Sequence, residues 1–123
     1  MKRIAYIEDD PDMVELVSMI LEKHGYQVDG FTESREIMPR LESVKPELIL
    51  LDLMMPHVDG LELYEEIRSR DGMEETPVVI ISAMKRAVTE IERQGTMKVE
   101  ACLVKPFTIV ELLDTVKRII GRA

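Results

Sequence analysis

Short apolar runs alternate along the chain with stretches in which apolar side chains recur every three or four positions. The runs are typical of buried β-strands, and the longer period is typical of helices with one buried face. Strands are expected at Ile4 to Ile7, Tyr26 to Phe31, Leu48 to Leu51, Val78 to Ile81 and Ala101 to Val104. Because helical patterns separate them, the sequence predicts an α/β domain with a parallel sheet between two layers of helices. The second run alternates apolar and polar residues, which suits an edge strand.

Three of the five expected helices have clear boundary signals. Asp10 and Asp59 are the expected caps of the first and third helices, Pro11 suits a first helical position, and Thr108 and Glu111 have capping-box spacing before the last. The expected ranges are Pro11 to about Gly25, Gly60 to Ser69, and Thr108 to Ile120. The expected buried faces are Met13, Leu16, Val17, Ile20 and Leu21 in the first helix, Leu63, Tyr64 and Ile67 in the third, and Ile109, Leu112, Leu113, Val116 and Ile120 in the last.

The other two helical patterns are weaker. The second, around Ser34 to Val44, contains Pro39, which removes a backbone donor and is expected to shorten or kink the helix. The fourth, around Arg86 to Arg93, has a stripe of only three apolar residues, so little burial holds it in place. We therefore expect the fourth helix to be the most mobile element.

Length and charge narrow the range of functions. A chain of 123 residues fits one domain, expected to span residues 1 to 123. The formal net charge of −8 argues against direct binding of nucleic acid and of anionic membranes. Cys102 is the single cysteine, so no internal disulfide can form, and no apolar segment is long enough for a signal peptide or a membrane span. We expect a cytoplasmic protein without membrane insertion.

Polar residues follow each of the four continuously apolar strands. Glu8 and Asp9 follow the first, Asp52 the third, Ser82 the fourth and Lys105 the fifth. The carboxyl ends of parallel strands meet at one edge, where open α/β sheets bind ligands. One acidic cluster after a strand is usually a loop or a helix cap, but the coincidence at four strand ends favours a functional site.

The expected chemistry of this edge is phosphoryl transfer with a divalent cation. Carboxylates 4 Å apart repel by about 4 kcal/mol per pair at an effective dielectric constant near 20, so a cation is needed to hold them together. Mg²⁺ prefers such oxygen ligands and often binds a substrate phosphate as well. Lys105 and Ser82 would then contact phosphoryl oxygens.

The chain resembles the receiver (response-regulator) domain of two-component signalling over essentially its full length. The resemblance lies in the runs Ile7-Glu8-Asp9-Asp10-Pro11, Leu51-Asp52-Leu53-Met54-Met55-Pro56 with Asp59-Gly60, Val79-Ile80-Ile81-Ser82-Ala83 and Val104-Lys105-Pro106-Phe107. It implies a flavodoxin-like three-layer sandwich with a five-stranded parallel sheet of order 2-1-3-4-5 and five helices. It also implies a switch protein with chemistry on itself alone, rather than an enzyme with a pool of substrate.

The resemblance implies a role for each matching position. Asp52 would accept a phosphoryl group from a histidine kinase or histidine phosphotransfer protein. Asp9 and Asp52 would ligate Mg²⁺ directly, Glu8 would act through a water, and the main-chain carbonyl of Met54 would complete the site. The Met54 side chain would line the path of the hydrolytic water, so a polar replacement should change the lifetime of the phosphorylated state.

Ser82 and Lys105 are the two remaining members of the site that the resemblance implies. Ser82 occupies the position of the Thr or Ser that moves toward the phosphoryl group, and Lys105 that of the lysine that contacts phosphate. The phosphorylated chain would then bind an unknown downstream protein.

The chain departs from the family in the segment before Lys105. Cys102 occupies the position where most receivers have a Tyr or Phe that swings inward upon activation. The spacing from Ser82 to Lys105, 105 − 82 = 23 residues, is also about one residue longer than is usual. We hypothesise that this protein signals without aromatic rotation, through displacement or altered packing of the fourth helix and fifth strand.

Several alternatives are open from sequence alone. The protein could be a stand-alone regulator, which its end at Gly121-Arg122-Ala123 without an evident linker favours, or a relay intermediate that passes the phosphoryl group to a second histidine. A truncated DNA-binding regulator is a weaker possibility. A phosphatase of the haloacid-dehalogenase type also uses an aspartyl nucleophile, but it requires a second Asp two residues later, where this chain has Met54. His24 and His57 are expected to be solvated and without a catalytic role.

Overall fold

The computed structural model describes residues 2–33, 36–56, 58–95 and 97–122. Strands and helices alternate in this part of the chain, as the sequence pattern predicts. The strands are β1 (Arg3–Ile7), β2 (Gln27–Phe31), β3 (Leu48–Asp52), β4 (Val78–Ser82) and β5 (Ala101–Val104). The helices are α1 (Pro11–Lys23), α2 (Ile37–Val44), α3 (Gly60–Ser69), α4 (Lys85–Gln94) and α5 (Ile109–Ile120). None of the helices in the described ranges is long and apolar enough to cross a membrane.

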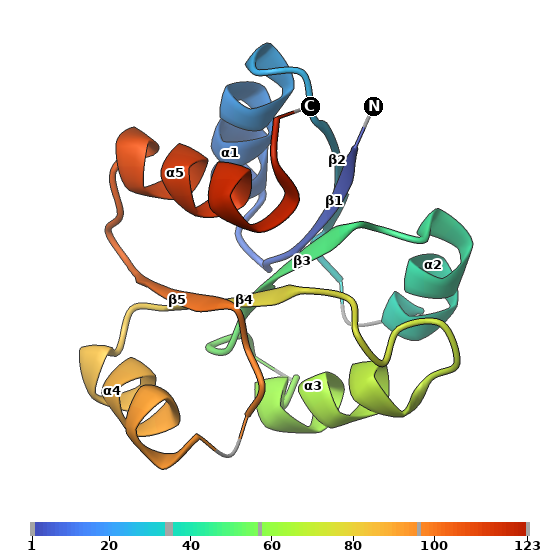
Figure 1. Ribbon diagram of the computed structural model, residues 1–123, viewed down its shortest axis with the longest axis vertical. Helices are drawn as coiled ribbons and strands as arrows, with labels where there is room; N and C mark the ends of the chain where they lie inside the picture. Colours follow the sequence, from blue (N-terminus) through green and yellow to red (C-terminus); the bar gives the residue numbers. More distant parts are fainter. Residues whose placement is uncertain (1, 34–35, 57, 96, 123) are drawn as a thin grey trace.

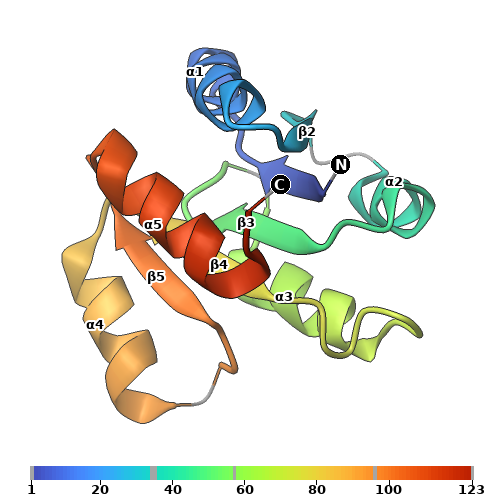
Figure 2. The ribbon, with the colours of Figure 1, turned by 45° about the horizontal axis from the view of Figure 1, so that its top comes forward.

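The five strands form one parallel sheet in the order β2-β1-β3-β4-β5. Helices α1 and α5 cover one face, and α2, α3 and α4 cover the other (Figure 1). Viewed from a second direction, α5 lies across β4 and β5 (Figure 2), and its Leu112 packs in the same core as Leu103 of β5. This is the flavodoxin-like three-layer sandwich that the resemblance implies.

Each face of the sheet has its own apolar core. In β1, Ile4 and Tyr6 pack toward α1 and α5, whereas Ala5 and Ile7 pack toward the opposite helices. Because successive strand residues point to opposite faces, a strand covered on both sides must be apolar throughout. The edge strand β2 instead exposes Gln27.

Side-chain caps fix the helix starts where the sequence signals them. Asp10 accepts a hydrogen bond from Asp12 N–H at the start of α1, and Thr108 and Glu111 form the complete capping box of α5. Asp59 caps α3 through the N–H groups of Leu61 and Glu62.

The two weaker helices also form. Pro39 lies in the first turn of α2, where no intrahelical donor is lost, and the described helix begins at Ile37. The expected start at Ser34 lies outside the described residues. In α4 only Val88 is fully buried, which agrees with the weak apolar stripe. The expected mobility of α4 stays a prediction.

Two residues assigned to the buried helix faces are exposed, so that part of the prediction was wrong. Leu16 of α1 is 52% exposed and Ile109 of α5 is 55% exposed. Leu16 lies at the margin of its apolar stripe, and Ile109 is the first residue of α5. Both line a cavity of about 490 Å³ together with Phe107 and Lys105. The cavity lies beside the carboxyl edge of the sheet, since Ala83 and Lys105, which follow β4 and β5, also line it.

Candidate functional site

The carboxyl edge of the sheet gathers the predicted polar side chains. Asp52 is the last residue of β3 and Ser82 the last of β4, while Glu8 directly follows β1 and Lys105 directly follows β5. Glu8, Asp9 and Asp52 each offer a carboxylate oxygen, and these oxygens lie within 4.8 Å of one another. The predicted cluster of three carboxylates is therefore present in the fold.

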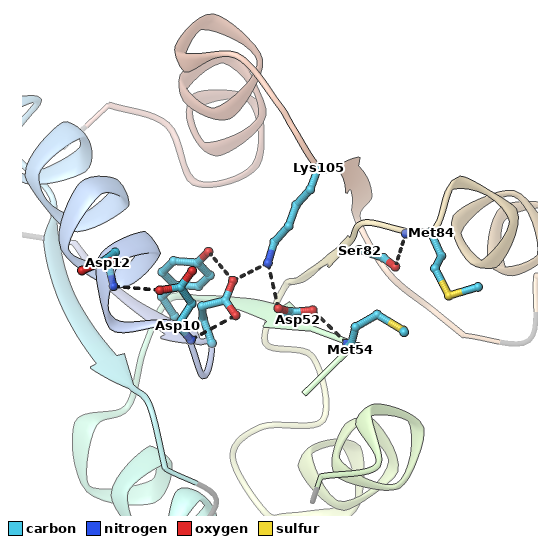
Figure 3. Close-up of polar contacts among 9 residues, drawn as sticks. Asp10, Asp12, Asp52, Met54, Ser82, Met84 and Lys105 are labelled. Atoms are coloured by element: carbon cyan, nitrogen blue, oxygen red, sulfur yellow. Dashed lines mark hydrogen bonds and ion pairs between the residues drawn. The ribbon is translucent and has the colours of Figure 1, made fainter. Parts of the chain in front are cut away.

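Lys105 is the cation of this cluster. Its Nζ atom lies 2.5 Å from Oε1 of Glu8 and 2.9 Å from Oδ2 of Asp52, so one ammonium group joins two strand ends (Figure 3). The side chains of Glu8 and Asp52 are 1% and 2% exposed. Buried charges are tolerated only when paired, so Lys105 offsets the cost of bringing these two carboxylates together.

Asp52 is held as the anion. Its Oδ1 accepts a hydrogen bond of 2.8 Å from the backbone N–H of Met54 (Figure 3). Burial alone would raise the pKa of Asp52, but hydrogen bonds involving Glu8, Met54 and Lys105 outweigh it and keep the pKa below its usual value. An ionised carboxylate at the base of an open edge is a competent oxygen nucleophile.

Glu8 is the more basic member of the pair. Burial, reinforced by the neighbouring Asp52, raises the pKa of Glu8, and Lys105 only partly opposes this. The two adjacent carboxyls shift in opposite directions because the interaction between them raises the pKa of Glu8 and lowers that of Asp52, and because Asp52 also accepts the hydrogen bond from Met54 N–H. As pH rises, Asp52 therefore loses its proton before Glu8 does.

Tyr6 belongs to the site, although sequence analysis assigned it only to a strand. It is completely buried, and its hydroxyl donates a hydrogen bond of 3.2 Å to Oε1 of Glu8. The signal was present in the sequence, since residues two apart in a strand point to the same face. It was missed because an aromatic residue in an apolar run is ordinarily core.

Ser82 and Met54 lie at the edge, but among the described residues neither side chain forms a hydrogen bond with the Asp52 carboxylate. The Ser82 hydroxyl is buried and accepts a hydrogen bond of 3.1 Å from Met84 N–H at the start of α4 (Figure 3). The Met54 side chain is half exposed. Their expected roles toward a phosphoryl group stay predictions.

Cys102 is a half-buried residue of β5 whose side chain packs against the core on the α4 side of the sheet. Burial and the nearby Glu92 carboxylate raise the pKa of its thiol to about 11. The group is therefore a neutral thiol at physiological pH, and it fills far less space than an aromatic ring. Signalling without aromatic rotation stays a hypothesis.

The donor set fits a hard divalent cation. Three carboxylates with oxygens this close provide the ligand type and charge that Mg²⁺ requires, and Asp9 is the most accessible of the three. Among the described residues, Lys105 pairs with the two more buried carboxylates, Glu8 and Asp52, and not with Asp9. A cation at this edge would share the charge of Asp52 with Lys105.

Comparison with known proteins agrees with this geometry. Residues 4–117 match the family model described as response regulator receiver domain. The phosphate regulon transcriptional regulatory protein PhoB of Rhizobium meliloti (strain 1021) is 32% identical over 121 residues, which are 98% of this chain and 53% of that protein. The chain spans about half the length of the curated relatives it matches.

Two solved structures illustrate the structural likeness. The chemotaxis protein CheY4 of Vibrio cholerae shares the fold, with a TM-score of 0.87, 23% identity and coverage of 98% of this chain and 99% of that one. The response regulator TrrA from Thermotoga maritima, solved in complex with Mg²⁺ and BeF, has a TM-score of 0.83 and 28% identity, and covers 98% of this chain and 100% of that one. This chain belongs to the receiver domains of two-component response regulators.

Proposed function

We propose that this chain is a phosphorylation-controlled switch whose acceptor is Asp52. The observation that carries the proposal is the paired arrangement of Asp52 as a buried anion, held by Met54 N–H, with the Lys105 ammonium 2.9 Å from its other oxygen. A nucleophile and a cation for the transferred phosphoryl group are thus present at one open edge. The phosphoryl donor is a phosphohistidine of a histidine kinase or a phosphotransfer protein, the partners of receiver domains.

The chain's own residues account for the transfer. A carboxylate oxygen of Asp52 attacks phosphorus in line, the P–N bond to the histidine breaks, and its electron pair remains on the imidazole nitrogen. Lys105 moves from the carboxylates to an equatorial phosphoryl oxygen, and Ser82 donates its hydroxyl hydrogen to another. The product is an aspartyl phosphate.

Magnesium, when bound, would supply positive charge to the phosphoryl oxygens in the transition state. The residues proposed to hold it are Asp9, Asp52 and the main-chain carbonyl of Met54, with Glu8 acting through a water. TrrA, a relative with the same fold, is described with Mg²⁺ bound, which supports this assignment.

The proposed switch depends on contacts that would differ between the unphosphorylated and the phosphorylated chain. Asp52 changes from about −1 to about −2 and gains acceptor oxygens. Ser82 is joined to Met84 at the start of α4, so its movement toward a phosphoryl oxygen would pull on that connection. A change from 1:99 to 99:1 in the active population requires roughly 5.5 kcal/mol from such differential contacts.

The test is incubation with phosphoramidate, a small P–N donor, followed by intact mass measurement. We expect one phosphoryl group per chain in the presence of Mg²⁺, none with excess EDTA, and its removal by hydroxylamine, which cleaves acyl phosphates. No added mass under conditions that label other receivers would overturn the proposed function.

The exposed apolar residues beside Lys105 are proposed to contact the protein donor. Leu16 lines the cavity at this edge, whereas Met19, equally apolar and 61% exposed on α1, does not. We expect Leu16→Ser to slow transfer from a phosphorylated histidine phosphotransfer domain about tenfold, because an apolar side chain that the donor would bury is lost, while phosphoramidate labelling is unchanged. Met19→Ser is the matched control. Equal transfer rates for the two variants would contradict this placement of the donor.

A further inference from the structure

Tyr6 is a buried polar residue in the middle of β1, the strand between β2 and β3. Its neighbours Ile4 and Ile7 are aliphatic and equally buried, so this position could be filled without a hydroxyl. A hydroxyl removed from water is costly unless it forms a hydrogen bond. In the described structure the Tyr6 hydroxyl forms its hydrogen bond by donating to Oε1 of Glu8.

Oε1 of Glu8 receives two donors, the Tyr6 hydroxyl and the Lys105 ammonium. The other oxygen, Oε2, accepts a longer hydrogen bond of 3.5 Å from the backbone N–H of Asp10. The carboxylate is thus anchored mainly through one oxygen, within a group of carboxylates whose oxygens lie within 4.8 Å of one another. A fixed rotamer is what a carboxylate needs in order to act on a metal-bound water.

The two donors to Glu8 are not equivalent. Lys105 is shared with Asp52, and in the proposed transfer it turns to a phosphoryl oxygen. The Tyr6 hydroxyl is attached to a buried strand and stays in place. Once Lys105 has moved, Tyr6 is the donor that still holds Oε1.

We propose that Tyr6 is a positioning residue for the divalent-cation site, which acts by anchoring Oε1 of Glu8 and thereby fixing the carboxylate that would act on the cation through a water. The inference rests on the proposed function, because it concerns the same Mg²⁺ site. It assigns a role to a residue inside the strand, in addition to the acidic residues at the strand end.

The test is a titration with Mg²⁺ alone, monitored through the NMR chemical shift of the Met54 amide. The hydrogen bond from this amide to Asp52 makes its shift sensitive to binding at the site. Tyr6→Phe keeps the ring and removes only the hydroxyl. Loss of such an outer donor typically weakens metal affinity 10- to 100-fold, and we expect an increase of about tenfold in the dissociation constant. Tyr26→Phe is the matched control, because Tyr26 is equally buried but donates to the Gly121 carbonyl at 2.7 Å, away from the carboxylates.

A double-mutant cycle with Glu8→Gln separates positioning from packing. If Tyr6 acts through Glu8, adding Tyr6→Phe to the Glu8→Gln variant leaves the dissociation constant unchanged within about twofold. An equal loss in both backgrounds, or no loss in Tyr6→Phe alone, would overturn the inference. If the unmodified chain shows no response to Mg²⁺, the proposed function fails together with it. Amide spectra without Mg²⁺ establish that each variant is folded.

Discussion

Asp52→Asn is expected to abolish phosphoryl labelling by phosphoramidate while leaving the protein folded. The amide has no anionic oxygen to attack phosphorus, so the covalent step is lost completely. The fold should tolerate the change because Lys105 retains its contact with Glu8, and one of two mutually repelling buried carboxylates is removed. Intact mass after labelling and a thermal unfolding curve measure the two effects.

Asp59→Asn is the matched control for this substitution. Asp59 also follows the β3 region but caps α3 instead of contacting Lys105, and Asn is an equally good N-cap. We expect its labelling and stability to match those of the unmodified chain. A hydroxylamine-sensitive phosphoryl group on Asp52→Asn would show that another residue is the acceptor.

Lys105→Met is expected to have the second largest effect, on both rate and stability. Removal of one preorganised partner of a developing anion typically costs 10²- to 10³-fold in rate, and we expect phosphorylation to slow by about this factor. Two buried carboxylates also lose their common cation, which should cost about 3 kcal/mol of unfolding free energy at neutral pH. The phosphoramidate labelling rate and denaturant unfolding measure these losses, and Lys117→Met, at an exposed position of α5, is the control.

The stability loss in Lys105→Met should depend on pH. The pKa of Glu8 in the folded protein is raised from its ordinary value of 4.5 to about 7. Between pH 4.5 and pH 7, folding is therefore accompanied by the uptake of a proton on Glu8. Stability from this group is present at low pH and is lost as pH rises through the folded pKa. We therefore expect the difference in unfolding free energy between Lys105→Met and the unmodified protein to be smaller at pH 5 than at pH 8. A deficit that is independent of pH would contradict the assigned role of Lys105 as counter-ion to Glu8.

Local patterns were sufficient to predict most of the architecture. The apolar runs predicted five strands because central strands of a parallel sheet are buried on both faces, and Asp10, Asp59 and Thr108 marked helix starts because capping depends on neighbouring residues only. The family motifs supplied the order of the strands, which local patterns do not contain. The prediction failed for Leu16 and Ile109, since a helical period shows which residues share a face but not how closely the next element approaches that face.

For the functional site, too, the sequence determined some features and the tertiary structure decided others. The sequence determined which side chains lie at the carboxyl edge, because the end of each strand is a local property and parallel strands bring their ends together. Only the tertiary structure decided the contacts among them: Lys105 on Glu8, 97 residues earlier, Tyr6 on the same carboxylate oxygen, and Met54 N–H on Asp52. These contacts depend on the spacing and twist of separate strands and on the rotamers that fit between them, which no local pattern specifies. The hydrogen bonds to Asp52 keep that carboxyl the anion, whereas burial and the neighbouring Asp52 raise the pKa of Glu8 in spite of Lys105.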